Sequence, residues 1–163
     1  MPPAEALKPV ASPPVLFAEV RRFFLPDLDR HRRWFFPRFL REFSHLNERS
    51  AIGFLRGILE SSEFMFLTLH ENSFQNGVAL FQSMWSGGLE PEPIIWERFV
   101  WVEDPANVEQ QKAAAFFYPR IEKWAKGLGT KIIHVECKSD VSRELIKAQA
   151  GRVYETSQAY LRC

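Results

Sequence analysis

Apolar and polar residues follow two different periods along this chain. Residues 15–24 are mostly apolar with the alternation of a strand, and later runs rich in Phe, Leu, Ile and Val have the length of strands. Apolar residues spaced three and four apart predict amphipathic helices between them. The predicted strands are 15–24, 63–70, 78–85, 94–103, 131–137 and one or two within 152–162, and the predicted helices are 28–43, 48–61, one that carries Gln110–Ala115 near its start, and one from Ser139 or Asp140 to Ala150.

Helix boundaries are indicated by residues that cap or interrupt helices. Asp27 or Asp29 can cap the helix over 28–43, because a short carboxylate accepts hydrogen bonds from the free amides of a first turn. Pro37 lies inside this helix and is expected to kink it.

The dipeptide Asn76-Gly77 is the strongest turn signal in the chain, and it predicts a β-hairpin turn within 72–77. No internal repeat is evident. The predicted organisation is an extended arm over 1–14, which contains five prolines, followed by a single domain over 15–163.

Composition narrows the class of protein. The chain has 163 residues, 46% of them hydrophobic and 14% aromatic, with a formal net charge of +1. Generic attraction to nucleic acid or to an anionic membrane is therefore not expected. No apolar run is long enough to cross a bilayer, and two cysteines give no disulfide framework, so a cytoplasmic location is the expectation.

The segment from Ile94 to Glu155 carries the most specific pattern. It runs strand, turn (104–107), helix, strand, helix and strand. The first helix therefore begins just after the short turn that ends a strand. A helix that begins in this way offers free amides and a positive dipole end to a phosphate. In this order and at these lengths the segment resembles the acyl-CoA-binding half of the GNAT superfamily of N-acetyltransferases, and the order of elements after the arm resembles that fold throughout.

The resemblance implies the fold class and the place of a cofactor. The fold would be α/β (α+β), with a mixed, mostly antiparallel central sheet of six to seven strands flanked by about four helices. Acetyl-CoA would lie in a splay between the fourth and fifth strands, near Val102 and Val135. Its diphosphate would meet the start of the following helix.

The glycine loop that binds the diphosphate in this family is only partly matched. The nearest match is Gln110-x-x-Ala113-x-Ala115, so two alanines stand where glycines let the backbone approach a phosphate. The residues that would hold acetyl-CoA, if it binds, are Val102, Gln110, Gln111, Lys112, Ala113 and Ala115. The methyl groups at 113 and 115 are expected to crowd the diphosphate, so no cofactor is expected unless the protein is an active enzyme.

Catalytic residues implied by the resemblance are incomplete as well. A carboxylate on the fourth strand commonly acts as the base, and Glu97 and Glu103 are the candidates. An even separation predicts that they share a face with Phe99 and Trp101. The alternative is that both glutamates simply reach solvent. The tyrosine that commonly serves as the acid is replaced by Lys147.

Other chemistry is not indicated by the sequence. His134 and Cys137 differ by an odd count on one strand and so are expected to face opposite sides, which argues against a nucleophile pair. The four histidines and two cysteines have no metal-ligand spacing, so no metal site is expected.

Arginine and aromatic residues are concentrated between Arg30 and Arg41. Such a mixture suits an acidic protein surface, a nucleic acid or another partner. The alternative is a helix whose arginine stems cover core aromatics. The candidate interface residues are Arg30, Arg33, Trp34, Phe36, Arg38 and Arg41.

Three hypotheses follow from these patterns. The first is an active acetyl-CoA-dependent N-acetyltransferase. The second is a GNAT-fold protein with a degenerate acyl-CoA site that binds other protein subunits through the N-terminal arm and the 28–43 helix. It would be an oligomeric assembly component similar to proteins encoded among tailed-phage structural genes. Such a protein would be located in the virion. The third is a nucleic-acid binder through Arg30–Arg41, which predicts steep salt dependence. The second is favoured, because the glycine loop and the helical tyrosine are altered together.

Overall fold

The computed structural model describes residues 18–71, 74–130, 132–136 and 161–162. The predicted arm, the predicted helix that ends at Ala150, and with it Lys147, lie outside the described residues, as does Cys137. No helix in the described ranges is both long enough and apolar enough to cross a membrane.

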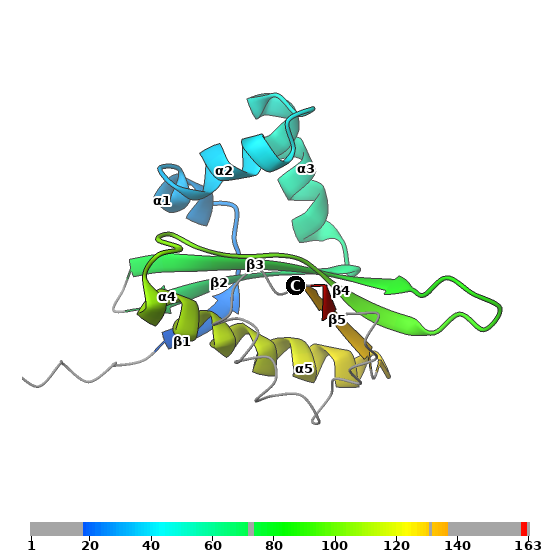
Figure 1. Ribbon diagram of the computed structural model, residues 1–163. Helices are drawn as coiled ribbons and strands as arrows, with labels where there is room; N and C mark the ends of the chain where they lie inside the picture. The colour runs from blue at the N-terminus through cyan, green and yellow to red at the C-terminus, as the bar shows by residue number, and fades with distance from the viewer. Residues whose placement is uncertain (1–17, 72–73, 131, 137–160, 163) are drawn as a thin grey trace, which may run out of the picture.

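A single mixed sheet forms the centre of the molecule (Figure 1). Its strands, in spatial order over the described residues, are β1 (Ala18–Arg22), β2 (Phe64–Glu71), β3 (Phe74–Trp85), β4 (Pro93–Val102), β5 (Ile132–Glu136) and β6 (Leu161–Arg162). Strands β1 to β4 pair antiparallel with one another, whereas β5 runs parallel to β4 and β6 parallel to β5. The predicted mixed sheet is confirmed, although β6 is only two residues long and the number of strands lies at the low end of the prediction.

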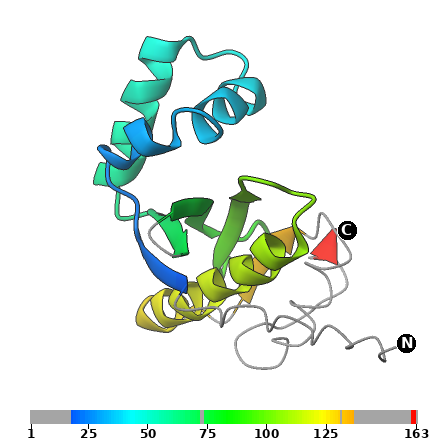
Figure 2. The ribbon, with the colours of Figure 1, turned by 90° about the vertical axis from the view of Figure 1, so that its left-hand side faces the viewer.

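Helices cover both faces of this sheet (Figures 1 and 2). One face carries α1 (Asp27–His31), α2 (Phe35–Glu42) and α3 (Glu48–Glu60), and the other carries α4 (Val108–Ala113), the 3-10 turn η1 (Ala114–Phe116) and α5 (Phe117–Gly127). Each face therefore has its own apolar core. The core under α5 includes Phe117 and Ile121, and the core under α2 and α3 includes Phe35 and Leu55.

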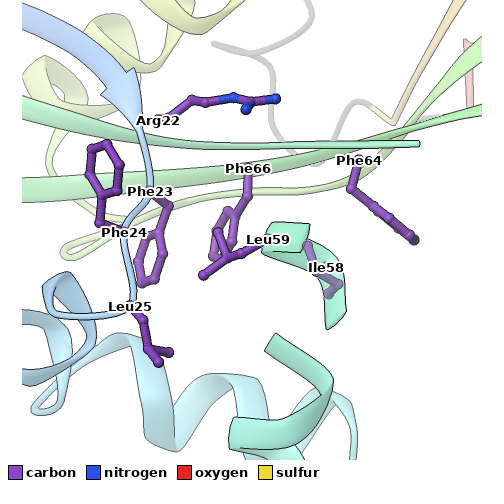
Figure 3. Close-up of a pocket in the computed structure, with 8 residues that line it drawn as sticks. All are labelled: Arg22, Phe23, Phe24, Leu25, Ile58, Leu59, Phe64 and Phe66. Carbon is purple, nitrogen blue, oxygen red and sulfur yellow. The ribbon is translucent and has the colours of Figure 1, made fainter. Parts of the chain in front are cut away.

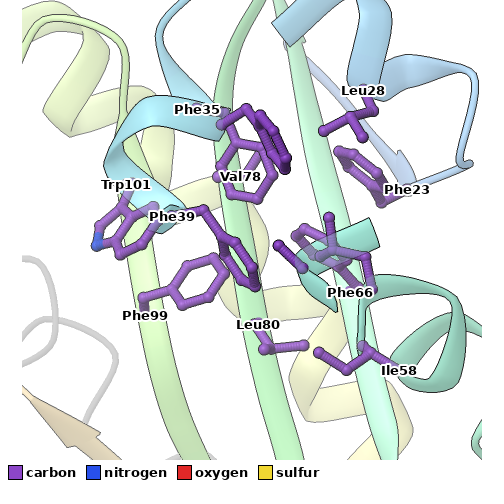
Figure 4. Close-up of a cluster of buried hydrophobic side chains, with 13 residues drawn as sticks. Phe23, Leu28, Phe35, Phe39, Ile58, Phe66, Val78, Leu80, Phe99 and Trp101 are labelled. Carbon is purple, nitrogen blue, oxygen red and sulfur yellow. The ribbon is translucent and has the colours of Figure 1, made fainter. Parts of the chain in front are cut away.

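Aromatic side chains dominate the core under α2 and α3, as Figure 4 shows. Phe35 is fully buried, and its ring lies 5.5–6.2 Å from the ring centres of Phe23, Phe39, Phe66, Phe99 and Trp101. The high aromatic content of the sequence is thus used largely for packing between these helices and the sheet.

The predicted helix over 28–43 is two helices, so the expected kink at Pro37 is wrong. The break falls at residues 32–34, between α1 and α2. Pro37 lies in the first turn of α2, where a missing N–H costs no hydrogen bond. Asp27 is not an N-cap. Its buried carboxylate accepts hydrogen bonds from the Phe24 amide and from the Arg21 guanidinium, and so ties β1 to the start of α1.

The predicted hairpin within 72–77 is confirmed, since β2 and β3 pair antiparallel up to Glu71 with Phe74, but Asn76-Gly77 is not its turn. Both residues lie within β3, and the register shifts between Leu69 and His70, so that Leu69 pairs with Gly77 and His70 with Gln75. Asn76 is therefore the extra residue of a β-bulge. Glycine is needed next to it, because a β-carbon at 77 would lie 3.2 Å from Cβ of Leu69.

Replacing Gly77 with alanine is expected to lower the free energy of unfolding by about 1–3 kcal/mol, because the added methyl must displace a buried neighbour. Gly53→Ala in α3 is the matched control, since nothing lies within 4 Å of the added methyl there. That change is expected to stabilise the protein by about 0.5–1 kcal/mol through helix propensity. Urea denaturation of both variants measures the difference, and equal effects would contradict the close packing at Gly77.

Candidate functional site

Strands β4 and β5 pair over only part of their length. The register joins Ile94 with Ile132 and continues to Trp96 with His134, whose rings stack 3.8 Å apart. Within the described residues, β4 has no partner on this side from Glu97 onward. The two strands therefore stop pairing after Trp96 and His134, and the resemblance places a cofactor between them, near Val102 and Val135.

A β-bulge in β4 lies at the same point. Leu80 pairs with Phe99 and Phe81 pairs with Glu97, so Arg98 is the extra residue. A bulge shifts the alternation of faces by one residue. Glu97 consequently points toward α5, whereas Phe99 and Trp101 belong to the core under α2 and α3.

The predicted common face for Glu97, Glu103, Phe99 and Trp101 is therefore wrong. Glu97 is 4% exposed, and its carboxylate accepts a hydrogen bond of 3.1 Å from the Tyr118 hydroxyl. Glu103 is exposed beyond the end of β4, and its backbone N–H donates to the carbonyl of Asn76. The two candidate bases thus have different surroundings, and only Glu97 lies beside the point where β4 and β5 diverge.

Tyr118 is a residue of this site that the sequence analysis did not single out. It lies on α5, is 7% exposed and packs edge-on against Phe81. A helical spacing of Tyr118 with Ile121 and Ala125 on the buried face was the available signal. That spacing does not reveal that Glu97 is the hydrogen-bond partner of Tyr118, because the bulge in β4 decides toward which face Glu97 points.

The amides at the start of α4 already donate hydrogen bonds within the chain. Asn107 caps the helix, and its side-chain oxygen accepts from the N–H groups of Glu109 at 3.0 Å and Gln110 at 3.2 Å. Its backbone carbonyl accepts from the N–H of Gln111. These amides are therefore committed to the helix itself.

The side chains expected to hold the cofactor are engaged in the same local network. Gln110 accepts a hydrogen bond from the Asp104 amide, and the Gln111 side chain donates to the Pro105 carbonyl. The ammonium of Lys112 lies 3.2 Å from the Glu109 carboxylate, although both groups are well exposed and the pair contributes little.

Ala113 and Ala115, the two alanines of the partly matched glycine loop, differ in their burial. Ala113 is 5% exposed and belongs to the core under α5, so its methyl group faces the sheet. Ala115 is half-buried in η1, and Val102 is buried. Ala113 therefore contributes to the core, and the crowding of a diphosphate by the two methyl groups stays a prediction.

Aromatic side chains near the diverging strands are distributed over both layers. Trp101 lies in the core under α2 and α3, Phe117 is fully buried under α5, and Phe116 is half exposed. Trp101 and Phe117 are thus used in separate cores.

The candidate interface residues of α1 and α2 also divide into two groups. Phe36 is 5% exposed and Trp34 is partly buried, so the expectation that Phe36 forms part of a surface is wrong. The helix is aromatic over a wide face because it packs into a broad core. Arg33 and Arg41 are exposed, Arg38 is half-buried over Trp101, and Arg30 lies in α1.

A small apolar pocket lies between the end of β1 and α3, as Figure 3 shows. It measures about 140 Å³ and is lined by Arg22, Phe23, Phe24, Leu25, Ile58, Leu59, Phe64 and Phe66. The guanidinium of Arg22 points away from the apolar side chains. The pocket therefore suits an apolar group and offers nothing to a phosphate. Among the described side chains, no group of three or more His, Cys, Asp or Glu lies placed to hold a metal ion.

Comparison with known proteins identifies the fold. No protein-family model matches the sequence, and no curated protein sequence matches it. Solved structures do match over most of their length. The aminoglycoside 6'-N-acetyltransferase AAC(6')-Ih from Acinetobacter baumannii superposes with a TM-score of 0.60 at 9% identity, over 86% of this chain and 95% of that one.

Two further structures agree. The aminoglycoside N-acetyltransferase AAC(6')-Iy in complex with CoA has a TM-score of 0.59 at 14% identity, covering 93% of both chains. A transcriptional regulator from Bacillus halodurans C-125 has a TM-score of 0.61 at 12% identity, over 83% of this chain and 92% of that one. These likenesses lend no support to a phage origin, which stays a prediction. At such low identities the likeness concerns the fold, and this chain has the GNAT fold of the N-acetyltransferases.

Proposed function

We propose that this chain is a GNAT-fold protein that does not bind acyl-CoA in the manner of the family and that serves as a protein-binding component. The hydrogen bonding at the start of α4 carries the proposal. Three amides there, those of Glu109, Gln110 and Gln111, donate within the chain. A diphosphate would have to displace the Asn107 cap, and losing such a cap costs about 0.5–2 kcal/mol before any phosphate contact forms.

The connection between β3 and β4 supports a protein-binding role. We call residues 85–92 the finger, which extends beyond the helices in Figure 1. Trp85 is 67% exposed and Leu89 is fully exposed. Ser86 and Glu92 are joined by two hydrogen bonds, of 2.8 and 2.9 Å, which close the finger at its base. Large apolar side chains on an ordered loop are typical of interaction sites, because little entropy is lost when they are covered.

An active acetyl-CoA-dependent N-acetyltransferase is the second candidate. Similar structures contain CoA or a bisubstrate analogue, and Glu97 lies where β4 and β5 diverge, as a base would. Against this candidate, Glu97 is buried and hydrogen-bonded to Tyr118, so it is poorly placed to take a proton from an amine in solvent.

Calorimetric titration with acetyl-CoA separates the two candidates. Under the proposal, no saturable heat is expected up to about 1 mM acetyl-CoA, which corresponds to a binding free energy weaker than about −4 kcal/mol. The AAC(6')-Iy protein, whose structure contains CoA, is the positive control. A micromolar dissociation constant that competes with free CoA would overturn the proposal and favour the enzyme.

A further inference from the structure

We propose that Arg38 is the receptor for a carboxylate on an acidic segment of a partner protein; this inference rests on the proposed protein-binding function and names the chemistry of the partner. The site lies where α2 crosses β4.

A fixed aromatic platform holds the Arg38 guanidinium. Its central carbon lies 4.5 Å from the ring centre of Trp101. Trp101 is only 2% exposed and stacks on Phe99 with ring centres 4.0 Å apart. The guanidinium thus rests on a buried ring that is stacked on Phe99, and the negative potential of an indole face attracts a cation. The planar guanidinium group of Arg38 is therefore held in place before a ligand binds.

Hydrogen-bond donors at this position have no acceptor among the described residues. Arg38 forms neither a hydrogen bond nor an ion pair there, whereas Arg21 and Arg32 each pair with a carboxylate. The buried N–H of the Trp101 indole also has no acceptor. The Trp101 N–H is enclosed in the core, whereas the half-buried guanidinium of Arg38 stays open to an acceptor from a partner protein.

The charge at the site favours an anion. Burial lowers the pKa of Arg38; the nearby Glu42 carboxylate opposes this shift, and the Arg41 charge adds to it. A guanidinium nevertheless stays protonated at neutral pH. A half-desolvated cation without an ion-pair partner is costly, and a carboxylate that accepts two parallel N–H bonds offsets that cost. The exposed Arg33 and Arg41 add positive charge nearby.

An acidic protein segment fits this surface better than a nucleic acid does. Single-stranded nucleic acids are bound through exposed aromatic rings on which bases stack. The aromatic residues of α2 cannot serve this purpose, because Phe35 and Phe36 are buried. Arg32 is already paired with Glu48, and the net charge of the chain is only +1.

Fluorescence anisotropy with fluorescein-labelled hexaglutamate at low ionic strength tests the site. The wild-type protein is expected to bind the peptide, and Arg38→Gln is expected to weaken binding at least about tenfold through loss of a charge-assisted pair. Arg38→Lys keeps the charge and most of the apolar stem but loses the fork, and about a fivefold loss is expected. Arg49→Gln, on an exposed position of α3, is the matched control and is expected to change binding by less than about twofold.

Three results would overturn the inference. If Arg49→Gln weakens binding as much as Arg38→Gln, the attraction is general positive charge. Tighter binding of single-stranded oligo-dT with the same dependence on Arg38 would indicate a nucleic-acid site. Absence of peptide binding by the folded wild-type protein would exclude the receptor. Acetyl-CoA calorimetry on the same protein tests the proposed function independently, because acetyl-CoA binding would contradict that function whatever the peptide does. Thermal melting of each variant shows that it is folded.

Discussion

Replacement of Phe35 by alanine is expected to lower the free energy of unfolding by about 3–5 kcal/mol. Phe35 is fully buried at the centre of the core under α2 and α3, and its ring touches aromatic side chains from β2, β4 and the β1–α1 connection (Figure 4). The change removes the transfer free energy of the ring and leaves a cavity that the stiff neighbouring rings cannot fill by small movements.

Urea denaturation followed by circular dichroism measures this effect. Phe116→Ala is the matched control, because that phenylalanine is 51% exposed, and its loss is expected to cost less than about 1 kcal/mol. If the two variants were destabilised equally, Phe35 could not be the centre of the packing between α2 and the sheet.

The second large effect is expected from Tyr118→Phe, which should lower the free energy of unfolding by about 1–3 kcal/mol. The substitution keeps the ring against Phe81 but removes the hydroxyl that donates to Glu97. The Glu97 carboxylate then loses a hydrogen bond at a position that is 4% exposed. A buried charged acceptor that loses a donor is costly, because water cannot replace the bond.

A double-mutant cycle isolates this interaction. In a Glu97→Met background the carboxylate is absent, so adding Tyr118→Phe is expected to cost less than about 0.5 kcal/mol. Equal costs of Tyr118→Phe in both backgrounds, measured by denaturation at neutral pH, would mean that the hydroxyl stabilises the protein by some route other than Glu97.

Sequence periodicity located most of the elements that the structure describes, and it failed where register changes. Helix α3 and strands β2, β4 and β5 agree with their predicted ranges to within one or two residues. The hairpin lies within the predicted range 72–77, but Asn76-Gly77, a strong turn signal in isolation, forms part of a bulge in β3 and not the turn. The turn preference of one dipeptide contributes less free energy than the pairing of two whole strands does.

The sequence predicted where the candidate site lies, and the structure shows how its residues are arranged. The prediction puts the site at the end of β4 and the start of the next helix. The sequence also contained the signal for the cap, since Asn107 precedes Val108 and Glu109 in the manner of a helix N-terminus. The sequence prediction assigns Asn107 only to the turn over 104–107 and not to a helix cap. The consequence, that the amides expected to receive a phosphate are already bonded, became evident once the cap distances were known.

The chain's own order of apolar runs, turns and helical stretches was enough to fix the class of fold, because burying alternate faces of strands and single stripes of helices leaves few ways to layer them. It also predicted some of the residues around the candidate site, among them Glu97 and Gln110 but not Tyr118. Only the tertiary structure decided which way those residues face. One extra residue at Arg98 turns Glu97 toward α5 and leaves Trp101 under α2, where Arg38 covers it. A strand carries no mark of such a bulge in its own sequence, since the shift exists only relative to the partner strand.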